Sequence, residues 1–183
     1  VGRWKVNGGQ LALTFNGNLT GSGSLVKTGA GTNVIATGIT ASYTGGTTVS
    51  NGVLVVNGSL SGVVTVAGGA TLGGKGTASG AVTVQGGGLA PGDITSATPG
   101  VMTLGSLTMN AGSAVFHLSS SAASGNDQVA VSGGLTFSGI STLQIAPLAF
   151  MNVGDVYTLL TYTGTALPST LTTNLQVTAP TGF

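Results

Sequence analysis

Three carboxylates, Asp93, Asp127 and Asp155, are the residues of this chain that could carry acid–base chemistry. Glycosidases need two carboxyl groups about 5–10 Å apart, and these aspartates are separated by 34 and 28 positions. Each follows a Gly or an Asn, a setting in which an Asp side chain usually caps the backbone of a turn. A polysaccharide lyase would also need a basic group nearby, and the only arginine, Arg3, is distant in sequence from all three. We therefore predict turn-capping aspartates and keep a polysaccharide-cleaving enzyme as a remote alternative.

His117 is the single histidine, and it could act as a base or ligate a metal ion. A serine hydrolase would place it beside a nucleophilic Ser, but the sequence has no Gly-x-Ser-x-Gly elbow. One His and no Cys also leave too few ligands for zinc. Alternation along Val115–Leu118 directs Phe116 and Leu118 inwards and His117 outwards. We therefore expect an exposed strand histidine, and we predict no catalytic, cofactor-binding or metal-binding residues.

A glycine run and two aromatic residues could bind ligands, and each also has a structural interpretation. Gly86-Gly87-Gly88 could cradle an anion, but no helix is expected after it, so a corner turn is favoured. Tyr43 precedes Thr44-Gly45-Gly46 and is expected to pack at a corner rather than to stack on a sugar. Trp4 lies near the start of the chain, where it could cover the end of the fold or contact a neighbouring molecule.

The composition excludes several kinds of protein. Gly (34), Thr (28), Ser (18) and Asn (10) make up about half of the 183 residues, whereas charged residues make up 4%. A helical bundle needs Glu and Lys on its faces, and this chain has no Glu. Four cations cannot form the basic face that nucleic-acid binding requires. The 41% hydrophobic content is too high for a disordered tail, yet the apolar runs are too short for a membrane-spanning helix. We expect no nucleic-acid partner and no membrane insertion of this segment.

Short β-branched runs, separated by Gly and Asn-Gly pairs, recur at a fixed spacing. The runs alternate in hydrophobicity, which is typical of strands. Two columns of aliphatic residues keep a period of 17–18 positions: Val49, Val66 and Val84 in one, and Leu54, Leu72 and Leu89 in the other. A fixed short period of strands and turns indicates a solenoid, because each repeat is too short to bury its own apolar face.

Strands of successive coils would pair in parallel about 4.8 Å apart around a narrow aliphatic core. A two-sheet sandwich would instead place turns every 8–12 residues or so, and two columns in common register would then be accidental. We therefore predict an all-β chain that forms a single-stranded parallel β-helix, a β-solenoid with about 17–20 residues per coil.

The whole chain, 1–183, is expected to form one solenoid domain. Residues 1–112 carry the regular coils, and residues 113–183 carry wider coils with an inserted loop near 119–127. Residues 90–100 are interpreted as a second loop, because they combine Pro, Gly and Asp.

Residues 23–57 carry a pattern that is similar to that of a known family. It consists of GSLVKTGAG from Gly23, TGGTTV from Thr44 and GVLVVNG from Gly52. This pattern closely resembles the passenger-associated transport repeat of bacterial autotransporters (type V secretion). Segments similar to such passengers also start at Gly86, Asp127 and Gly154.

The resemblance implies a right-handed parallel β-helix that is exported across a Gram-negative outer membrane and then displayed or released outside. In that family the repeat is associated with efficient transport of the passenger. The chain starts at Val1 rather than Met and is expected to be an excised passenger portion, or a relative that uses the same solenoid for another purpose. A full-length precursor would add an outer-membrane translocator as its partner.

Three functions follow from these expectations. The first is a non-catalytic extracellular structural protein that forms a surface stalk or associates head-to-tail into a fibre, because the open ends of a β-helix expose unpaired backbone groups. The second is an adhesin that binds surfaces, glycans or other cells through a lateral face. The third is the enzyme named above, for which no cofactor is predicted.

Overall fold

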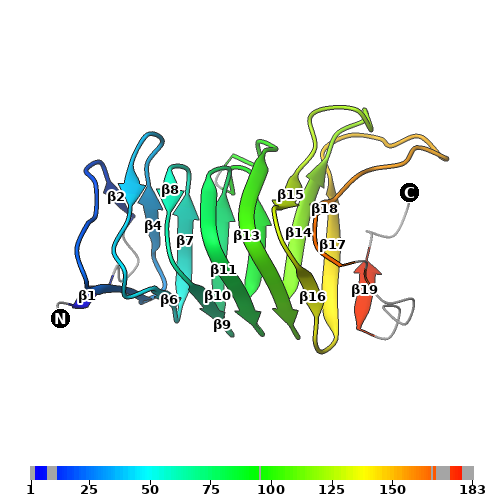
Figure 1. The fold of residues 1–183 in the computed structure, drawn as a ribbon. Coiled ribbons are helices and arrows are strands. Elements are labelled where there is room, and N and C mark those ends of the chain that lie inside the picture. Colours follow the sequence, from blue (N-terminus) through cyan, green and yellow to red (C-terminus); the bar gives the residue numbers. More distant parts are fainter. Residues whose placement is uncertain (1–2, 8–11, 95, 166, 168–173, 179–183) are drawn as a thin grey trace.

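The computed structural model describes residues 3–7, 12–94, 96–165, 167 and 174–178, and within these ranges the chain forms strands, turns and loops without a helix. The strands lie side by side along one axis, with β1 (Arg3–Asn7) at one end and β19 (Leu175–Thr178) at the other (Figure 1). The prediction of an all-β chain is thus confirmed.

The strands form two parallel sheets. The first contains β1, β3 (Ser24–Thr28), β5 (Thr40–Ala41), β6 (Thr47–Val49), β8 (Ser59–Leu60), β9 (Val64–Ala67), β11 (Thr77–Gln85), β13 (Val101–Asn110), β15 (Gln128–Val131), β16 (Leu135–Phe137) and β18 (Leu160–Tyr162). The second contains β2 (Leu13–Phe15), β4 (Thr32–Ile35), β7 (Gly52–Val56), β10 (Ala70–Gly74), β12 (Gly88–Pro91), β14 (Ser113–Leu118), β17 (Ser141–Pro147) and β19.

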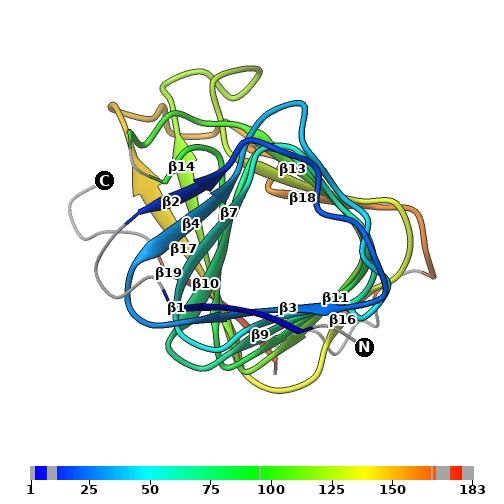
Figure 2. The ribbon, with the colours of Figure 1, turned by 90° about the vertical axis from the view of Figure 1, so that its left-hand side faces the viewer.

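Seen along the axis, the stacked coils enclose a three-sided outline (Figure 2). The first sheet supplies two sides because β11 and β13 are long and bend: the start of β11 pairs with β8, whereas its end pairs with β9. We call the β5–β8 side the first face, the β6–β9 side the second face and the second sheet the third face. Each coil runs from the first face to the second and then to the third, as the consecutive strands β8, β9 and β10 show.

The two aliphatic columns lie in register, as the sequence predicts. Val49 pairs with Val66 and Val66 with Val84 on the second face, while Leu54 pairs with Leu72 and Leu72 with Leu89 on the third. All six side chains are buried. Parallel pairing of successive coils therefore produces a solenoid-like stack with a continuous aliphatic core.

The number of residues between paired positions changes along the sequence. It is 17 from Leu72 to Leu89, 25 from Leu89 to Ala114 and 29 from Ala114 to Leu143. The additional residues form loops between a strand of the third face and the next strand of the first face. We call this edge of the stack the loop corner; it carries the loops 92–100, 119–127 and 148–159.

Glycines of successive coils stack at the corner between the first and second faces, which we call the glycine corner: Gly62, Gly80, Gly105 and Gly133. A Cβ on Gly80 would lie 1.9 Å from the carbonyl oxygen of Gly62, and one on Gly105 would lie 2.7 Å from that of Gly80. A Cβ on Gly133 would in turn lie 2.7 Å from the Gly105 oxygen. Successive coils therefore approach so closely here that no side chain fits.

The third corner joins the second face to the third face and is built from short turns. Gly86, between β11 and β12, adopts a φ of 71°, and a Cβ on Gly87 would lie 2.6 Å from the Ala67 carbonyl oxygen of the preceding coil. The predicted corner turn is thus confirmed for Gly86 and Gly87, and Gly88 is the first residue of β12.

Candidate functional site

The loops 119–127 and 148–159 project from the loop corner and form the most elaborate part of the described surface (Figure 1). Each leaves the end of a third-face strand, β14 or β17, and returns to a first-face strand, β15 or β18. Because all coils turn at the same edge, insertions in successive coils stack into one cluster. We call these two segments the lateral loops.

Asp127 holds the base of the first lateral loop through hydrogen bonds of its carboxylate. Its side chain is fully buried, and Oδ1 accepts the backbone N–H of Gly100 at 2.9 Å. Oδ2 accepts the backbone N–H of His117 at 2.8 Å and also lies 2.8 Å from His117 Nδ1. The backbone of Gly92 faces the same carboxylate, since a Cβ there would lie 2.2 Å from Oδ1. One buried aspartate therefore connects loop 92–100, strand β14 and loop 119–127.

The expectation for His117 was wrong in one respect. Phe116 and Leu118 are buried, which confirms the predicted alternation along β14. The His117 side chain, however, is only 21% exposed, because it folds back against Asp127. Nothing in the sequence pattern indicated this pair, since the two residues are ten positions apart and only closure of the loop brings them together.

The first lateral loop is held by its own polar groups. Asn126 Oδ1 accepts the backbone N–H of Ser119 at 2.8 Å, and its Nδ2 donates to the carbonyl oxygen of Ser121 at 2.7 Å. Ser119 Oγ donates to the carbonyl oxygen of Ser124 at 2.7 Å. The loop is thus a defined structure rather than an open connection.

Tyr157 joins the two lateral loops, because its hydroxyl donates to the carbonyl oxygen of Ser119 at 3.0 Å. Partial burial raises the pKa of the Tyr157 hydroxyl, and the negative charge of Asp155 raises it further. The hydroxyl therefore stays protonated and able to donate at neutral pH.

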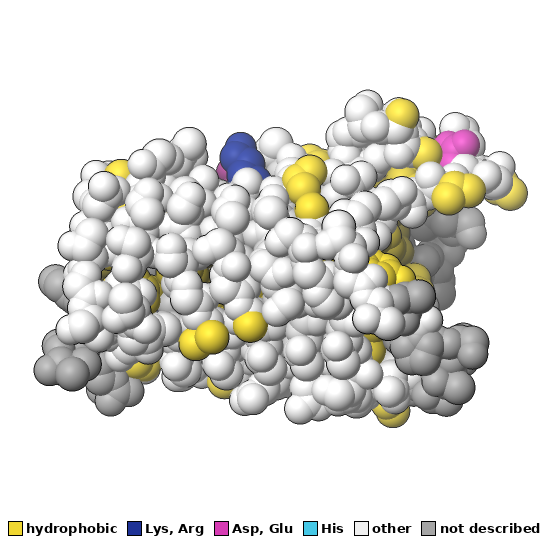
Figure 3. Space-filling view, viewed as in Figure 1, with side chains coloured by type: hydrophobic (Ala, Val, Ile, Leu, Met, Phe, Trp, Pro, Cys, Tyr) yellow, Lys and Arg dark blue, Asp and Glu magenta, His cyan; other side chains and the backbone are white. Residues whose placement is uncertain are grey.

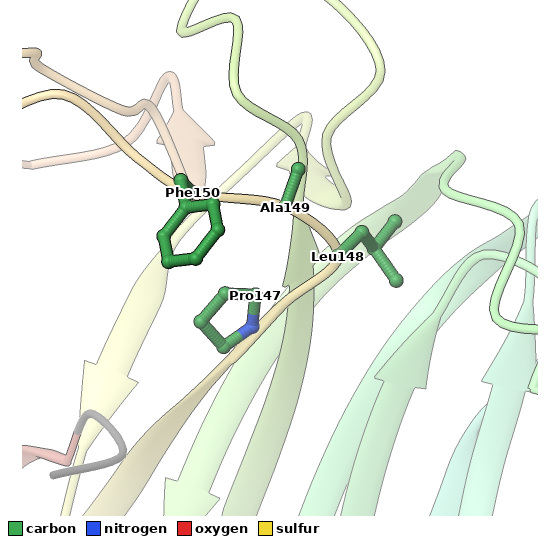
Figure 4. A pocket seen from close by; sticks show the side chains of 4 residues that line it. All are labelled: Pro147, Leu148, Ala149 and Phe150. Carbon is green, nitrogen blue, oxygen red and sulfur yellow. The ribbon is translucent and has the colours of Figure 1, made fainter. Parts of the chain in front are cut away.

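The second lateral loop presents apolar side chains to solvent. Phe150 is 87% exposed, and Val153 and Val156 are also almost fully exposed. Hydrophobic side chains are visible on this projecting part, and smaller hydrophobic patches are scattered over the rest of the face (Figure 3). A shallow pocket of about 230 Å³ lies at the base of the loop and is lined by Pro147, Leu148, Ala149 and Phe150 (Figure 4).

The three aspartates have different surroundings. Asp127 is buried and its oxygens accept the bonds described above. Asp155 is exposed and accepts a bond from Asn152 Nδ2 at 3.2 Å. Asp93 lies in loop 92–100, where its backbone N–H donates to Thr98 at 2.8 Å. None of the three lines the pocket at Phe150, and the described residues contain no group of three or more His, Cys, Asp or Glu side chains that could hold a metal ion.

Lys27 is a buried cation that the sequence analysis missed. It follows Leu25 by two positions on β3 and pairs with Val49, so it occupies a core position on the second face. Its Nζ donates to the carbonyl oxygens of Thr28, Gly29 and Asn51 at 3.0, 2.6 and 3.1 Å. The side chain is 1% exposed, and burial lowers the pKa of the ammonium group.

Two further polar side chains lie in the same part of the core. Tyr43 packs at the glycine corner as predicted; it is 1% exposed, and its hydroxyl lies 2.5 Å from Thr47 Oγ1. Burial raises the pKa of Tyr43 to about 12. Asn33 is also buried, and its side-chain atoms have no hydrogen-bond partner among the described residues. The side chains of Arg3 and Trp4 lie outside the described part, so the interpretation of Trp4 stays a prediction.

None of the described segments is a helix of the length and hydropathy that a membrane span requires.

Comparison with known proteins identifies the relatives of this chain. A family model described as the passenger-associated transport repeat matches residues 25–56, the stretch that contains Lys27 and Tyr43. The chain is also 41% identical over 189 aligned residues to the adhesin BmaC autotransporter of Brucella suis biovar 1 (strain 1330). That alignment covers 92% of this chain and 5% of the adhesin. The chain is therefore a stretch of autotransporter passenger with a transport repeat, located outside the cell or on the surface of a Gram-negative bacterium.

Proposed function

We propose that this chain is a non-catalytic structural segment, a stalk that spaces other parts of an extracellular passenger from the bacterial surface. The observation that supports this most is the unbroken parallel pairing from β1 to β18 in one sheet and from β2 to β19 in the other. Each coil contacts its neighbours, so stiffness is built up coil by coil along the axis.

The proposal includes the finer architecture: a single domain over 1–183 that forms a right-handed, single-stranded β-helix. A coil has about 17–20 residues where no loop is inserted, with regular coils over 1–112 and wider ones over 113–183. In the full-length precursor an outer-membrane translocator would be the partner.

Deletion of one complete coil tests the stalk in the full-length passenger. Val66 and Val84 occupy equivalent positions, so removal of 67–84 joins Val66 to the residue that follows Val84 and keeps the register. Display of an epitope beyond the stalk, measured by antibody labelling of intact cells, should be retained. Removal of 67–75 takes out half a coil and should abolish display. Equal display of both variants would contradict a stacked stalk.

The second candidate is an adhesin that binds through the lateral loops. It is favoured by the exposed side chains of Phe150, Val153 and Val156, since projecting apolar groups on a soluble surface often mark an interaction site. Replacing all three with Ser should reduce attachment of cells to their target while antibody labelling of the passenger stays unchanged. Unchanged attachment would leave the stalk as the function.

Head-to-tail association into a fibre is the remaining form of the structural proposal. The end strands β1 and β2 lie at one end of the two sheet orders, and β18 and β19 lie at the other. Edge strands can template pairing with another molecule. Electron micrographs of the purified protein at high concentration should then show filaments; isolated particles alone would contradict association.

A further inference from the structure

The corner between β6 and β7 places the buried Lys27 ammonium beside an Asn-Gly pair. Ser50 and Asn51 connect these strands, and Gly52 is the first residue of β7. Lys27 Nζ donates to the backbone carbonyl oxygen of Asn51 at 3.1 Å. This carbonyl belongs to the peptide bond whose nitrogen is that of Gly52, so the cation acts directly on that peptide unit.

The side chain of Asn51 is folded over the same peptide unit. Its Oδ1 accepts the backbone N–H of Gly52 at 2.8 Å. Because Cγ is bonded to Oδ1, this contact also holds the amide carbon of Asn51 close to the Gly52 nitrogen. Asn51 is exposed, so water reaches its side chain.

These groups are the reactants for closure of a succinimide ring. The Gly52 nitrogen loses its proton and attacks Cγ of Asn51; the bond between Cγ and Nδ2 breaks, and the amide nitrogen leaves as ammonia. Water then adds to one of the two ring carbonyls and opens the ring to aspartate or to isoaspartate. The sequence of steps consumes one water and releases one ammonia, without oxidation or reduction.

We propose that Asn51 is a site of spontaneous deamidation and that Lys27 promotes the reaction. Loss of the Gly52 proton leaves negative charge on the nitrogen and on the Asn51 carbonyl oxygen. The Lys27 ammonium is aimed at that oxygen from within the protein, where a fixed positive charge stabilises such a developing charge more strongly than in water. The inference does not depend on whether the protein is a stalk or an adhesin.

The isoaspartate product would disrupt this corner. Isoaspartate adds one methylene to the backbone, and Gly52 has no room for additional atoms: a Cβ there would lie 2.4 Å from the Gly29 oxygen and 2.6 Å from the Gly31 oxygen. Gly52 also holds a φ of 68°, which suits glycine. Deamidation would therefore loosen a coil of the transport repeat with time.

The protein holds a matched control in Asn57-Gly58. Asn57 Oδ1 accepts the backbone N–H of Lys75 at 3.3 Å instead of that of its own neighbour. The Gly58 N–H donates to the Ile35 carbonyl oxygen at 3.2 Å. The same dipeptide is thus present at the next corner along the chain, where its glycine N–H is bonded to a backbone carbonyl oxygen of the preceding coil.

The test is peptide mass spectrometry of the purified, folded protein during incubation at neutral pH. We expect Asn51 to deamidate about tenfold faster than Asn57, the difference that one charge-assisted hydrogen bond makes to a barrier. In denaturant the two sites should react at similar rates. If folded Asn51 reacts no faster than folded Asn57, the proposal is overturned.

Lys27→Gln and Lys27→Met test the role of the cation. Either variant, when circular dichroism shows it folded, should reduce the Asn51 rate to that of Asn57, because both remove the positive charge. An unchanged Asn51 rate in a folded variant would rule out promotion by Lys27. If neither variant folds, the comparison of Asn51 with Asn57 in the wild-type protein decides.

Discussion

Gly80→Ala should destabilise the stack strongly, although it adds a single methyl group. The new Cβ would lie 1.9 Å from the Gly62 carbonyl oxygen and 2.3 Å from its carbon, both backbone atoms of the preceding coil. Real Cβ atoms do not come within 3.0 Å of such a group, so the two coils must separate by about 1.1 Å. That shift is roughly a quarter of the strand spacing of about 4.8 Å.

The cost has two sources. Crowding of a packed interior by one methyl group costs about 1–3 kcal/mol. The separation also stretches the parallel ladder beside Gly80, and each weakened hydrogen bond contributes about 1 kcal/mol. Together these give an expected loss of about 3 kcal/mol in the free energy of unfolding.

Gly134→Ala is the matched control, since a Cβ on Gly134 would meet nothing within 4 Å. It should leave stability unchanged or raise it by about 0.4–1 kcal/mol, because Ala restricts the unfolded state. Urea unfolding followed by circular dichroism measures both variants. If the free energy of unfolding of Gly80→Ala differs from that of wild type by less than about 0.5 kcal/mol, the close contact described at the glycine corner is wrong.

Three further predictions concern buried side chains. Lys27→Met should lower the free energy of unfolding by about 2 kcal/mol, because it leaves three carbonyl oxygens without their donor; urea unfolding checks this, and a gain in stability would contradict it. Leu72→Ala should cost about 2–5 kcal/mol in the same assay, whereas Thr71→Ala on the outer side of β10 should cost less than about 1 kcal/mol. Equal losses would show that the inward and outward assignments are wrong. Tyr43→Phe should remove a loss of stability at alkaline pH. The Tyr43 hydroxyl ionises near pH 10 in the unfolded protein and near pH 12 in the folded protein. The contribution of Tyr43 to the free energy of unfolding is therefore intact below pH 10 and falls by up to about 3 kcal/mol as the pH rises towards 12.

The tyrosine prediction is tested by comparing two proteins at each pH. Burial lowers the pKa of Lys27, which makes stability rise with pH below 10.5, opposite to the effect of Tyr43. Wild type and Tyr43→Phe share Lys27, so the difference between their unfolding free energies isolates the tyrosine. A difference that stays constant from neutral pH to pH 12 would refute the assignment.

The stacked architecture could be predicted because its signal is local and repeated. Val66 and Val84 share a neighbour pattern, and side-chain alternation with period two fixes which of their neighbours turn inwards. The packing of Tyr43 at a corner was expected because this residue, before Thr44-Gly45-Gly46, fits an aromatic position of the transport repeat. For the valine column, nearby residues alone determine the environment.

The contact between Asp127 and His117 and the burial of Lys27 could not be predicted in the same way. Asp127 reaches His117 only because loop 119–127 closes, and the conformation of a long loop is not encoded in a periodic pattern. Lys27 follows Leu25 by two positions, so side-chain alternation placed it on the inner face of the strand. The groups that stabilise the buried ammonium, however, are backbone carbonyl oxygens, which every residue has and which no sequence pattern identifies.

The glycine corner and the loop corner divide the molecule into an edge that cannot vary and an edge that can. Bulk added at Gly80 or Gly105 forces neighbouring coils apart, so substitutions there should impair folding. At the loop corner the protein has already accepted insertions of different length without losing the register of its columns. Diversity between related passengers should therefore collect on one side, and a foreign peptide grafted for display belongs at the tip of 119–127 or 148–159.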